Sequence, residues 1–78
     1  MKIRNIGSSR TQVEKDDGTR ILVSYSTPVA AYIVGRGYVR TSFQHSKTTN
    51  SHIKQWLDGA ECETVAQAEL DALVQEMP

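Results

Sequence analysis

The chain has 78 residues, of which 38% are hydrophobic and 23% are charged, and this composition suits one small globular domain over residues 1–78. It excludes a membrane-spanning helix, which needs roughly 20 consecutive apolar residues, and an N-terminal secretion signal. A single cysteine, Cys62, excludes an internal disulfide and a multi-cysteine zinc site, so we expect a cytoplasmic protein with no cofactor and no metal.

The net charge is zero, but the two parts of the chain differ in sign. All nine Lys and Arg residues lie at or before Lys54, together with three acids, so residues 1–54 carry +6 and residues 55–78 carry −6. Such asymmetry indicates a surface that faces a polyanion, or head-to-tail association between copies. Attraction between the two parts within one fold is the alternative.

A hairpin is expected near the start of the chain, with strands over residues 11–15 and 20–26. The segment 16–19 (DDGT) between them contains Asp-Gly, a pair that favours the positive φ of a tight turn. Thr27-Pro28 is expected to interrupt the ladder after the second strand, because proline has no N–H to donate.

A second hairpin is predicted from a nearly continuous apolar run over residues 29–34, which is typical of a central strand. The glycines of the segment 35–37 (GRG) predict a tight turn into a strand over residues 38–43. A further strand over residues 3–6 has weaker support in the pattern.

A first helix is predicted from the spacing of Ile53, Trp56 and Leu57, which places three apolar side chains on one helical face. Gly59 is a natural stop signal just past this stripe. The candidate N-caps are Thr48, Thr49, Asn50 and Ser51.

A second helix is predicted to begin with a capping box formed by Thr64 and Gln67. Its apolar positions at helical spacing are Ala66, Leu70, Leu73, Val74 and Met77.

Strands come first and helices last in this order. We therefore expect an α+β fold with an antiparallel sheet of three or four strands, built from two hairpins, followed by two C-terminal helices packed on one face. The strand-rich, basic part covers about residues 1–45, and the helical part, acidic after Lys54, covers about residues 48–77.

Three stretches of the chain, 24–30 (SYSTPVA), 46–49 (SKTT) and 52–57 (HIKQWL), form the pattern S-Y-x-T-x-V-A followed by S-x-T-T-x-x-H-I-x-x-W-L. In this pattern the chain resembles a family of small uncharacterised proteins that occur in phages and prophages. The resemblance covers about residues 11–58 and leaves the second helix outside. It implies a phage or mobile-element origin, and hence the cytoplasm of a host cell, but it carries over no activity and no functional residue.

The most distinctive polar stretch is 45–50 (HSKTTN), between a predicted strand and a predicted helix. Free backbone N–H groups at a helix start, together with Lys47, can hold a phosphate or a carboxylate. The hydroxyl groups of Thr48 and Thr49 can instead cap the helix, and both roles are compatible. Lys47, Thr48 and Thr49 are therefore candidate anion-binding residues, and Lys54 is a further candidate as a cation that could extend a basic surface.

Tyr38, Arg40 and Ser42 are expected on one face of a strand, where an aromatic ring beside a cation can stack a base or hold a phosphate. Arg36 at the predicted hairpin tip, Tyr38 and Arg40 are therefore candidate nucleic-acid-binding residues. An ordinary solvated sheet face is the alternative. The cations that could extend a basic surface are Arg4, Arg10, Arg20, Lys47 and Lys54.

Catalytic patterns are weak in this sequence. His45 and His52 have no neighbouring set of further metal ligands. Ser46, either histidine and Asp58 could supply the residue types of a Ser-His-Asp catalytic triad, but nothing in the sequence resembles a nucleophile elbow or an oxyanion hole. We therefore expect a protein that is not an enzyme.

The leading interpretation is a small non-enzymatic binding protein of phage or mobile-element type that engages nucleic acid through a basic sheet surface. One alternative is an inhibitor directed at a host protein, such as an anti-defence or anti-CRISPR type protein. Another is a self-associating structural protein, for example a homodimer. None of these functions involves a membrane.

Overall fold

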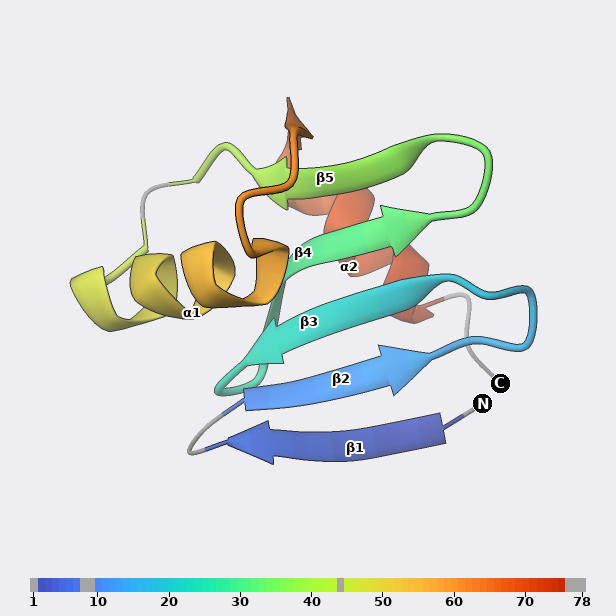
Figure 1. Ribbon diagram of the computed structural model, residues 1–78, viewed down its shortest axis with the longest axis horizontal. Coiled ribbons are helices and arrows are strands. Elements are labelled where there is room, and N and C mark those ends of the chain that lie inside the picture. Colours follow the sequence, from blue (N-terminus) through green and yellow to red (C-terminus); the bar gives the residue numbers. More distant parts are fainter. Residues whose placement is uncertain (1, 8–9, 44, 76–78) are drawn as a thin grey trace.

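The structure is a computed structural model, and it describes residues 2–7, 10–43 and 45–75. Together these residues form six strands and two helices (Figure 1). In chain order the elements are β1 (Lys2–Gly7), β2 (Arg10–Glu14), β3 (Arg20–Ser24), β4 (Thr27–Ile33), β5 (Gly37–Thr41), α1 (Lys47–Leu57), β6 (Cys62–Val65) and α2 (Gln67–Gln75). Neither of these helices is long and apolar enough to cross a bilayer.

All six strands belong to one sheet, and their spatial order β1-β2-β3-β4-β5-β6 follows the chain. The first five strands are joined by antiparallel pairing, whereas β6 lies parallel to β5. A parallel neighbour cannot be reached through a tight turn, so the chain crosses over through α1 before it returns as β6. The sheet is therefore mixed.

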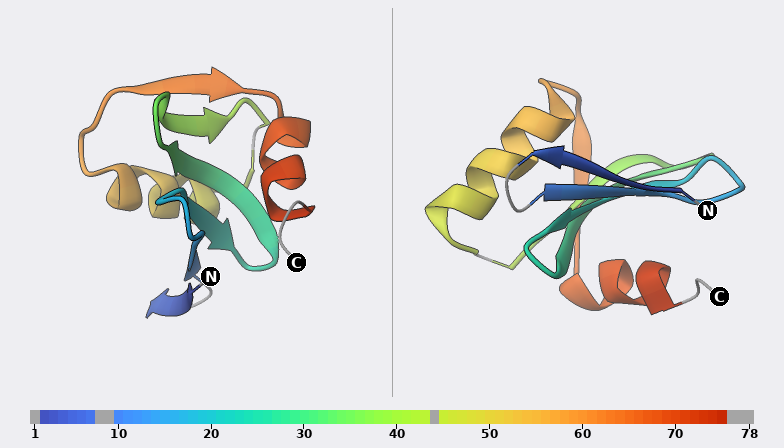
Figure 2. Two further views of the ribbon diagram at one scale, coloured as in Figure 1. Left: turned by 90° about the vertical axis from the view of Figure 1, so that its right-hand side faces the viewer. Right: turned by 90° about the horizontal axis from the view of Figure 1, so that it is seen from below.

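The two helices cover opposite faces of this sheet (Figure 2). On one face Ile53 and Leu57 of α1 pack against buried strand residues that include Leu22 and Ala30. On the other face Leu70 of α2 completes a second buried cluster. The remaining members of this second cluster are Val13, Ile21, Ala31, Val39 and Val65. Because side chains alternate along a strand, neighbouring residues such as Ile21 and Leu22 serve different cores.

The first predicted hairpin is confirmed, with Glu14 of β2 paired to Arg20 of β3. Gly18 adopts φ +95° in the connecting turn, a conformation in which an L side chain is strained. The backbone N–H of Thr19 donates to Asp17 Oδ1 at 2.9 Å, and this hydrogen bond holds the pKa of the Asp17 carboxyl below its usual range. The second predicted hairpin, formed by β4 and β5, is also confirmed.

The connection between β3 and β4 differs from the expectation. Ser24 pairs with Thr27, so only Tyr25 and Ser26 form the loop, and Tyr25 takes a positive φ of 58°. Pro28 does not interrupt the ladder but lies inside β4, next to a shift in register that accommodates the missing N–H. The predicted weak strand near the N-terminus exists as β1.

The first helix begins earlier than its predicted caps at residues 48–51. Ser46 is the N-cap, and its side chain accepts a hydrogen bond from the Thr49 backbone N–H at 3.2 Å. The predicted end is correct, because Asp58 is the C-cap in the left-handed region and Gly59 follows with φ +80°. The Asp58 N–H closes the last turn on the Lys54 carbonyl at 3.0 Å.

The predicted capping box at the second helix is wrong, because Thr64 belongs to strand β6 and α2 begins only at Gln67. The Gln67 side chain instead donates to the carbonyl of Pro28 at 2.6 Å, which ties the start of α2 to β4. The expected apolar positions Leu70, Leu73 and Val74 do face the sheet. Met77 lies outside the described residues.

The α+β class is correct, but the predicted architecture needs two corrections. The sheet has six strands and is mixed, where three or four antiparallel strands were expected. The helices lie on opposite faces rather than on one, because the chain enters the edge strand β6 from α1 on one side of the sheet and leaves it into α2 on the other side (Figure 2).

Candidate anion-binding site

Cationic side chains gather on the face of the sheet that carries α1. Directly paired strand residues share a face, so the pairing of Arg4 with Gln12, whose side chain contacts Trp56 of α1, places Arg4 there. The same argument from strand register and side-chain alternation places further cations on this face, and the outer side of α1 adds two more. Seven of the nine Lys and Arg residues therefore lie on what we call the basic face. They are Lys2, Arg4, Arg10, Arg20, Arg40, Lys47 and Lys54.

Acidic side chains are few on the basic face. Among the described strand residues Glu14 is the one acid that register places on it, opposite Lys2 and Arg20. The helix α1 carries no acidic residue between Lys47 and Leu57. The basic face therefore keeps a net positive charge.

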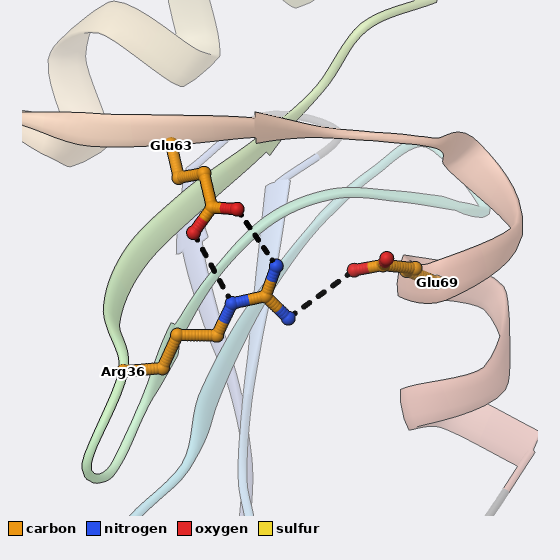
Figure 3. Close-up of polar contacts among 3 residues, drawn as sticks. All are labelled: Arg36, Glu63 and Glu69. Atoms are coloured by element: carbon orange, nitrogen blue, oxygen red, sulfur yellow. Dashed lines mark hydrogen bonds and ion pairs between the residues drawn. The ribbon is translucent and has the colours of Figure 1, made fainter.

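The face that carries α2 holds acids and the two remaining cations. Arg36 is bound there by Glu63 of β6 and by Glu69 of α2, at 3.1 and 3.2 Å (Figure 3). The Arg36 hydrogen bonds and charge hold the pKa of the Glu63 carboxyl below its usual range. Lys15 Nζ donates to the carbonyl of Leu73 at 3.5 Å.

An open depression of about 650 Å³ lies beside the first turns of α1 on the basic face. Three cations, Arg10, Lys47 and Lys54, line it together with other polar side chains such as Thr48 and His52. No acidic residue from the described part of the chain lines it. A depression with three positive charges and many hydrogen-bond donors is suited to an anion.

Arg10 is held in this depression by its surroundings. Its Nη1 donates to Gln55 Oε1 of α1 at 2.6 Å. Its guanidinium covers Gly7, where a Cβ atom would come within 2.7 Å of Arg10 Cζ and Nε. The Nε atom is buried and has no hydrogen-bond partner in the structure. Gly7 thus makes the space that the guanidinium occupies.

A buried polar cluster fixes the start of α1 over the sheet. Ser24 Oγ, at the end of β3, lies 3.0 Å from His52 Nδ1 and 3.2 Å from Thr49 Oγ1. Ser46 Oγ in turn donates to Thr49 Oγ1 at 3.3 Å. These hydrogen bonds satisfy the buried polar groups of Ser24, Thr49 and His52, which would otherwise be costly to bury, and His52 also lines the depression.

Three of the seven predicted site residues line the depression, namely Lys47, Thr48 and Lys54. Thr49 does not, because it is only 5% exposed and its hydroxyl group belongs to the buried cluster. For the stretch over residues 45–50, the structure therefore supports capping at Ser46 and an exposed polar surface at Lys47 and Thr48.

The other three predicted residues lie elsewhere. Arg36 is engaged by Glu63 and Glu69 on the opposite face. Tyr38 is half-buried under α1, with its ring edge-on to Trp56 at 5.8 Å. Arg40 is on the basic face but lies beside β6 rather than at the depression. The predicted open sheet surface around Tyr38 is therefore wrong, because α1 covers it.

Sequence reasoning named Arg10 only as an extension of the surface and missed Gly7, Gln55 and His52 as parts of the site. His52 had a signal, since it lies three residues after Thr49 and four before Trp56, on the inner side of the helix. Gly7 had none, because its contact with Arg10 depends on the irregular end of the β1–β2 pairing.

The residues considered for catalysis do not assemble as written. His52 contacts Ser24 rather than Ser46, and Ser24 is only 2% exposed, so a substrate cannot reach its hydroxyl group. His45 Nε2 lies 3.1 Å from Gln67 Oε1. Within the described residues no three His, Cys, Asp or Glu side chains gather as metal ligands would.

The fold and the depression define a small α+β domain with one helix on each face of a mixed sheet and a basic face at α1. The chain belongs to a family of unknown function (DUF8033), whose model matches residues 1–72. The expectation of an uncharacterised family is thus confirmed, and the matched region extends past residue 58 into α2. No curated protein and no solved structure matches the chain.

Proposed function

We propose that this protein is a non-enzymatic binding module that engages the phosphate backbone of nucleic acid through the depression and the surrounding basic face. The observation that carries the proposal is the separation of charge across the sheet. Seven cations share the α1 side, while Arg36 and Lys15 are occupied on the α2 side. Lysine and arginine side chains that replace condensed counterions on phosphates provide most of the affinity of such complexes.

The donors at the depression fit phosphate in particular. The Arg10 guanidinium is planar and has N–H groups besides the one that Nη1 donates to Gln55, so it can direct further N–H groups at an oxyanion. Lys47 and Lys54 add point charges from one stripe of α1. An apolar ligand would find no comparable match in this depression.

Origin and setting are part of the same proposal. A phage or mobile-element source, and hence a host-cell cytoplasm, follows from the resemblance of the motif around Ser24, Ser46 and His52. The exposed free thiol of Cys62 fits a reducing compartment.

Fluorescence anisotropy with a labelled oligonucleotide tests the function. We expect binding at low salt whose log K falls linearly with log salt concentration. The variant Lys47→Gln/Lys54→Gln should reduce that slope by about 0.7 to 0.9 for each lysine that contacts a phosphate. The matched control Lys15→Gln/Arg36→Gln removes the same charge from the opposite face and should leave the slope unchanged.

Absence of binding at low salt would refute the proposal. The basic face would then fit an acidic surface on a host protein, as an inhibitor would need. Equal loss in both double variants would show that net charge, rather than this face, determines affinity.

A second candidate function is self-association, which the opposite charges of the two faces favour. The basic face of one copy could stack on the Glu63 and Glu69 side of the next. Such a contact is heterologous and would build open assemblies. Sedimentation at low salt should then give a mass that rises with protein concentration, and a constant monomer mass would exclude it.

A further inference from the structure

The exposed aromatic ring of Tyr25 lies in a backbone position that does not suit it. Tyr25 is the first residue of the two-residue loop between β3 and β4, and its φ is 58°. Glycine, asparagine or aspartate is favoured where such a loop needs a positive φ, and a bulky aromatic residue there is strained. The turn alone would be better served by glycine, so the turn does not explain this side chain.

The core does not explain it either, because Tyr25 is 61% exposed. Its one aromatic neighbour among the described residues is His52, whose ring centroid lies 6.2 Å away at an interplanar angle of 38°. Strained residues cluster at functional sites, so a strained residue that holds a large ring in solvent indicates a site that binds a ligand.

The Tyr25 ring does not line the depression itself but is linked to it through His52. His52 pairs with the Tyr25 ring and also lines the depression, so one residue separates the two. Ser24, the residue before Tyr25, pairs directly with Arg10 across the β2–β3 ladder. An exposed aromatic ring therefore stands beside the cations that are proposed to hold phosphates.

This combination selects one form of nucleic acid. Proteins that bind single strands combine a positively charged path for the backbone with aromatic rings on which bases stack. Bases inside a duplex are already stacked on one another and offer no free face to such a ring.

Resting on the proposed function, we infer that Tyr25 is a base-stacking platform and that the target of this protein is single-stranded nucleic acid. A base lies on the Tyr25 ring while an adjoining phosphate occupies the depression at Arg10, Lys47 and Lys54. The strained positive φ of Tyr25 is retained because it holds the ring where a base can stack on it next to the bound phosphate.

The test separates turn stability from binding in the variants Tyr25→Gly and Tyr25→Phe. Glycine relieves the strained backbone, so Tyr25→Gly should melt at the same temperature as the wild type or higher. Its affinity for a labelled single-stranded oligonucleotide should nevertheless fall by about tenfold to a hundredfold, as loss of one stacked base predicts. Tyr25→Phe keeps the ring and should keep the affinity.

Two controls make the result specific. Affinity for a duplex of the same sequence should be weaker than for the single strand and should not respond to Tyr25→Gly. Phe43→Ala removes another exposed ring, 60% exposed, that does not line the depression, and it should leave single-strand affinity unchanged.

The possible outcomes separate base stacking on Tyr25 from the proposed binding of the phosphate backbone. Salt-dependent binding that Tyr25→Gly leaves unchanged, or equal binding of duplex and single strand, overturns the inference and keeps the proposed function. Binding of neither form removes both. A Tyr25→Gly variant that melts at a clearly lower temperature would show that the ring serves the fold, and that also overturns the inference.

Discussion

Individual side chains decide which cations are available to a partner. Arg36 at the predicted hairpin tip was a candidate for binding nucleic acid, yet two carboxylates from β6 and α2 hold it (Figure 3). No pattern in the sequence indicates this pairing, because Glu63 and Glu69 approach Arg36 only when β6 pairs with β5.

We predict that Arg36→Gln raises the pKa of Glu63 toward its ordinary value, because the hydrogen bonds from Arg36, followed by its charge, lower it. With a lowered pKa in the folded state, the Glu63 carboxylate contributes stability above its unfolded pKa, and this contribution is lost as the pH falls through the folded pKa. Carboxyl carbon shifts in an NMR pH titration measure the change. An identical Glu63 titration in variant and wild type would contradict the ion pair.

We predict that Gly7→Ala weakens oligonucleotide binding without unfolding the protein. The new Cβ must displace the Arg10 guanidinium, which is the flexible end of a side chain, so the fold can accommodate it. Loss of one charge-assisted contact corresponds to about 1.5–3 kcal/mol, or about tenfold or more in affinity. Anisotropy measures the loss, and a thermal melt confirms the fold. Wild-type affinity in this variant would show that the position of the guanidinium is unimportant.

The candidate site was predictable only where its residues share one element. Lys47 and Lys54 belong to one helix, in which seven residues make about two turns and return to the same face. Arg10 meets them from β2, and its exact seat depends on Gly7 and on the end of a strand pair. Tyr38 was misplaced because nothing in its own strand shows that α1 covers it.

Among the elements, those with local signals were predicted and those with distant partners were not. The hairpin around Gly18 and the end of α1 near Gly59 depend on nearby residues and were correct. The strand β6 has the sequence CETV, which lacks an alternating apolar pattern, and it exists because β5 offers an open edge. Because the sequence pattern does not indicate β6, both helices were predicted on one face of the sheet.

We predict that Ser46→Ala destabilises the protein by about 1 kcal/mol, because it removes the acceptor for the Thr49 backbone N–H. Thr48→Ala is the matched control, since Thr48 is exposed and was one of the caps predicted from the sequence. It should change the free energy of unfolding by less than about 0.5 kcal/mol. Urea denaturation measures both. A larger effect at Thr48 would place the cap there instead.

At the scale of the whole molecule, two small cores share a single sheet. Because Ile21 faces one core and Leu22 the other, loss of packing on either face loosens strands that serve both. The free energy of unfolding of ordinary domains is about 5–15 kcal/mol, and a chain of this size is expected to have a modest value.

We predict that Leu70→Ala under α2 and Ile53→Ala in α1 each cost about 2–5 kcal/mol and shift the same transition. Trp56 lies on the α1 side, so its fluorescence should report the Leu70→Ala destabilisation although that change is on the other face. Coincident unfolding curves from fluorescence and circular dichroism measure this coupling. Separate transitions would mean that the two layers unfold independently.

The parallel pairing of β5 with β6 also constrains how the protein is made on the ribosome. Tyr38 is translated well before its partner Cys62, and the whole of α1 must emerge between them. During that interval the nascent sheet ends at an uncovered β5 edge, a known template for intermolecular strand pairing. Translation that slows within α1 would prolong this exposure and raise the fraction of chain lost to aggregation.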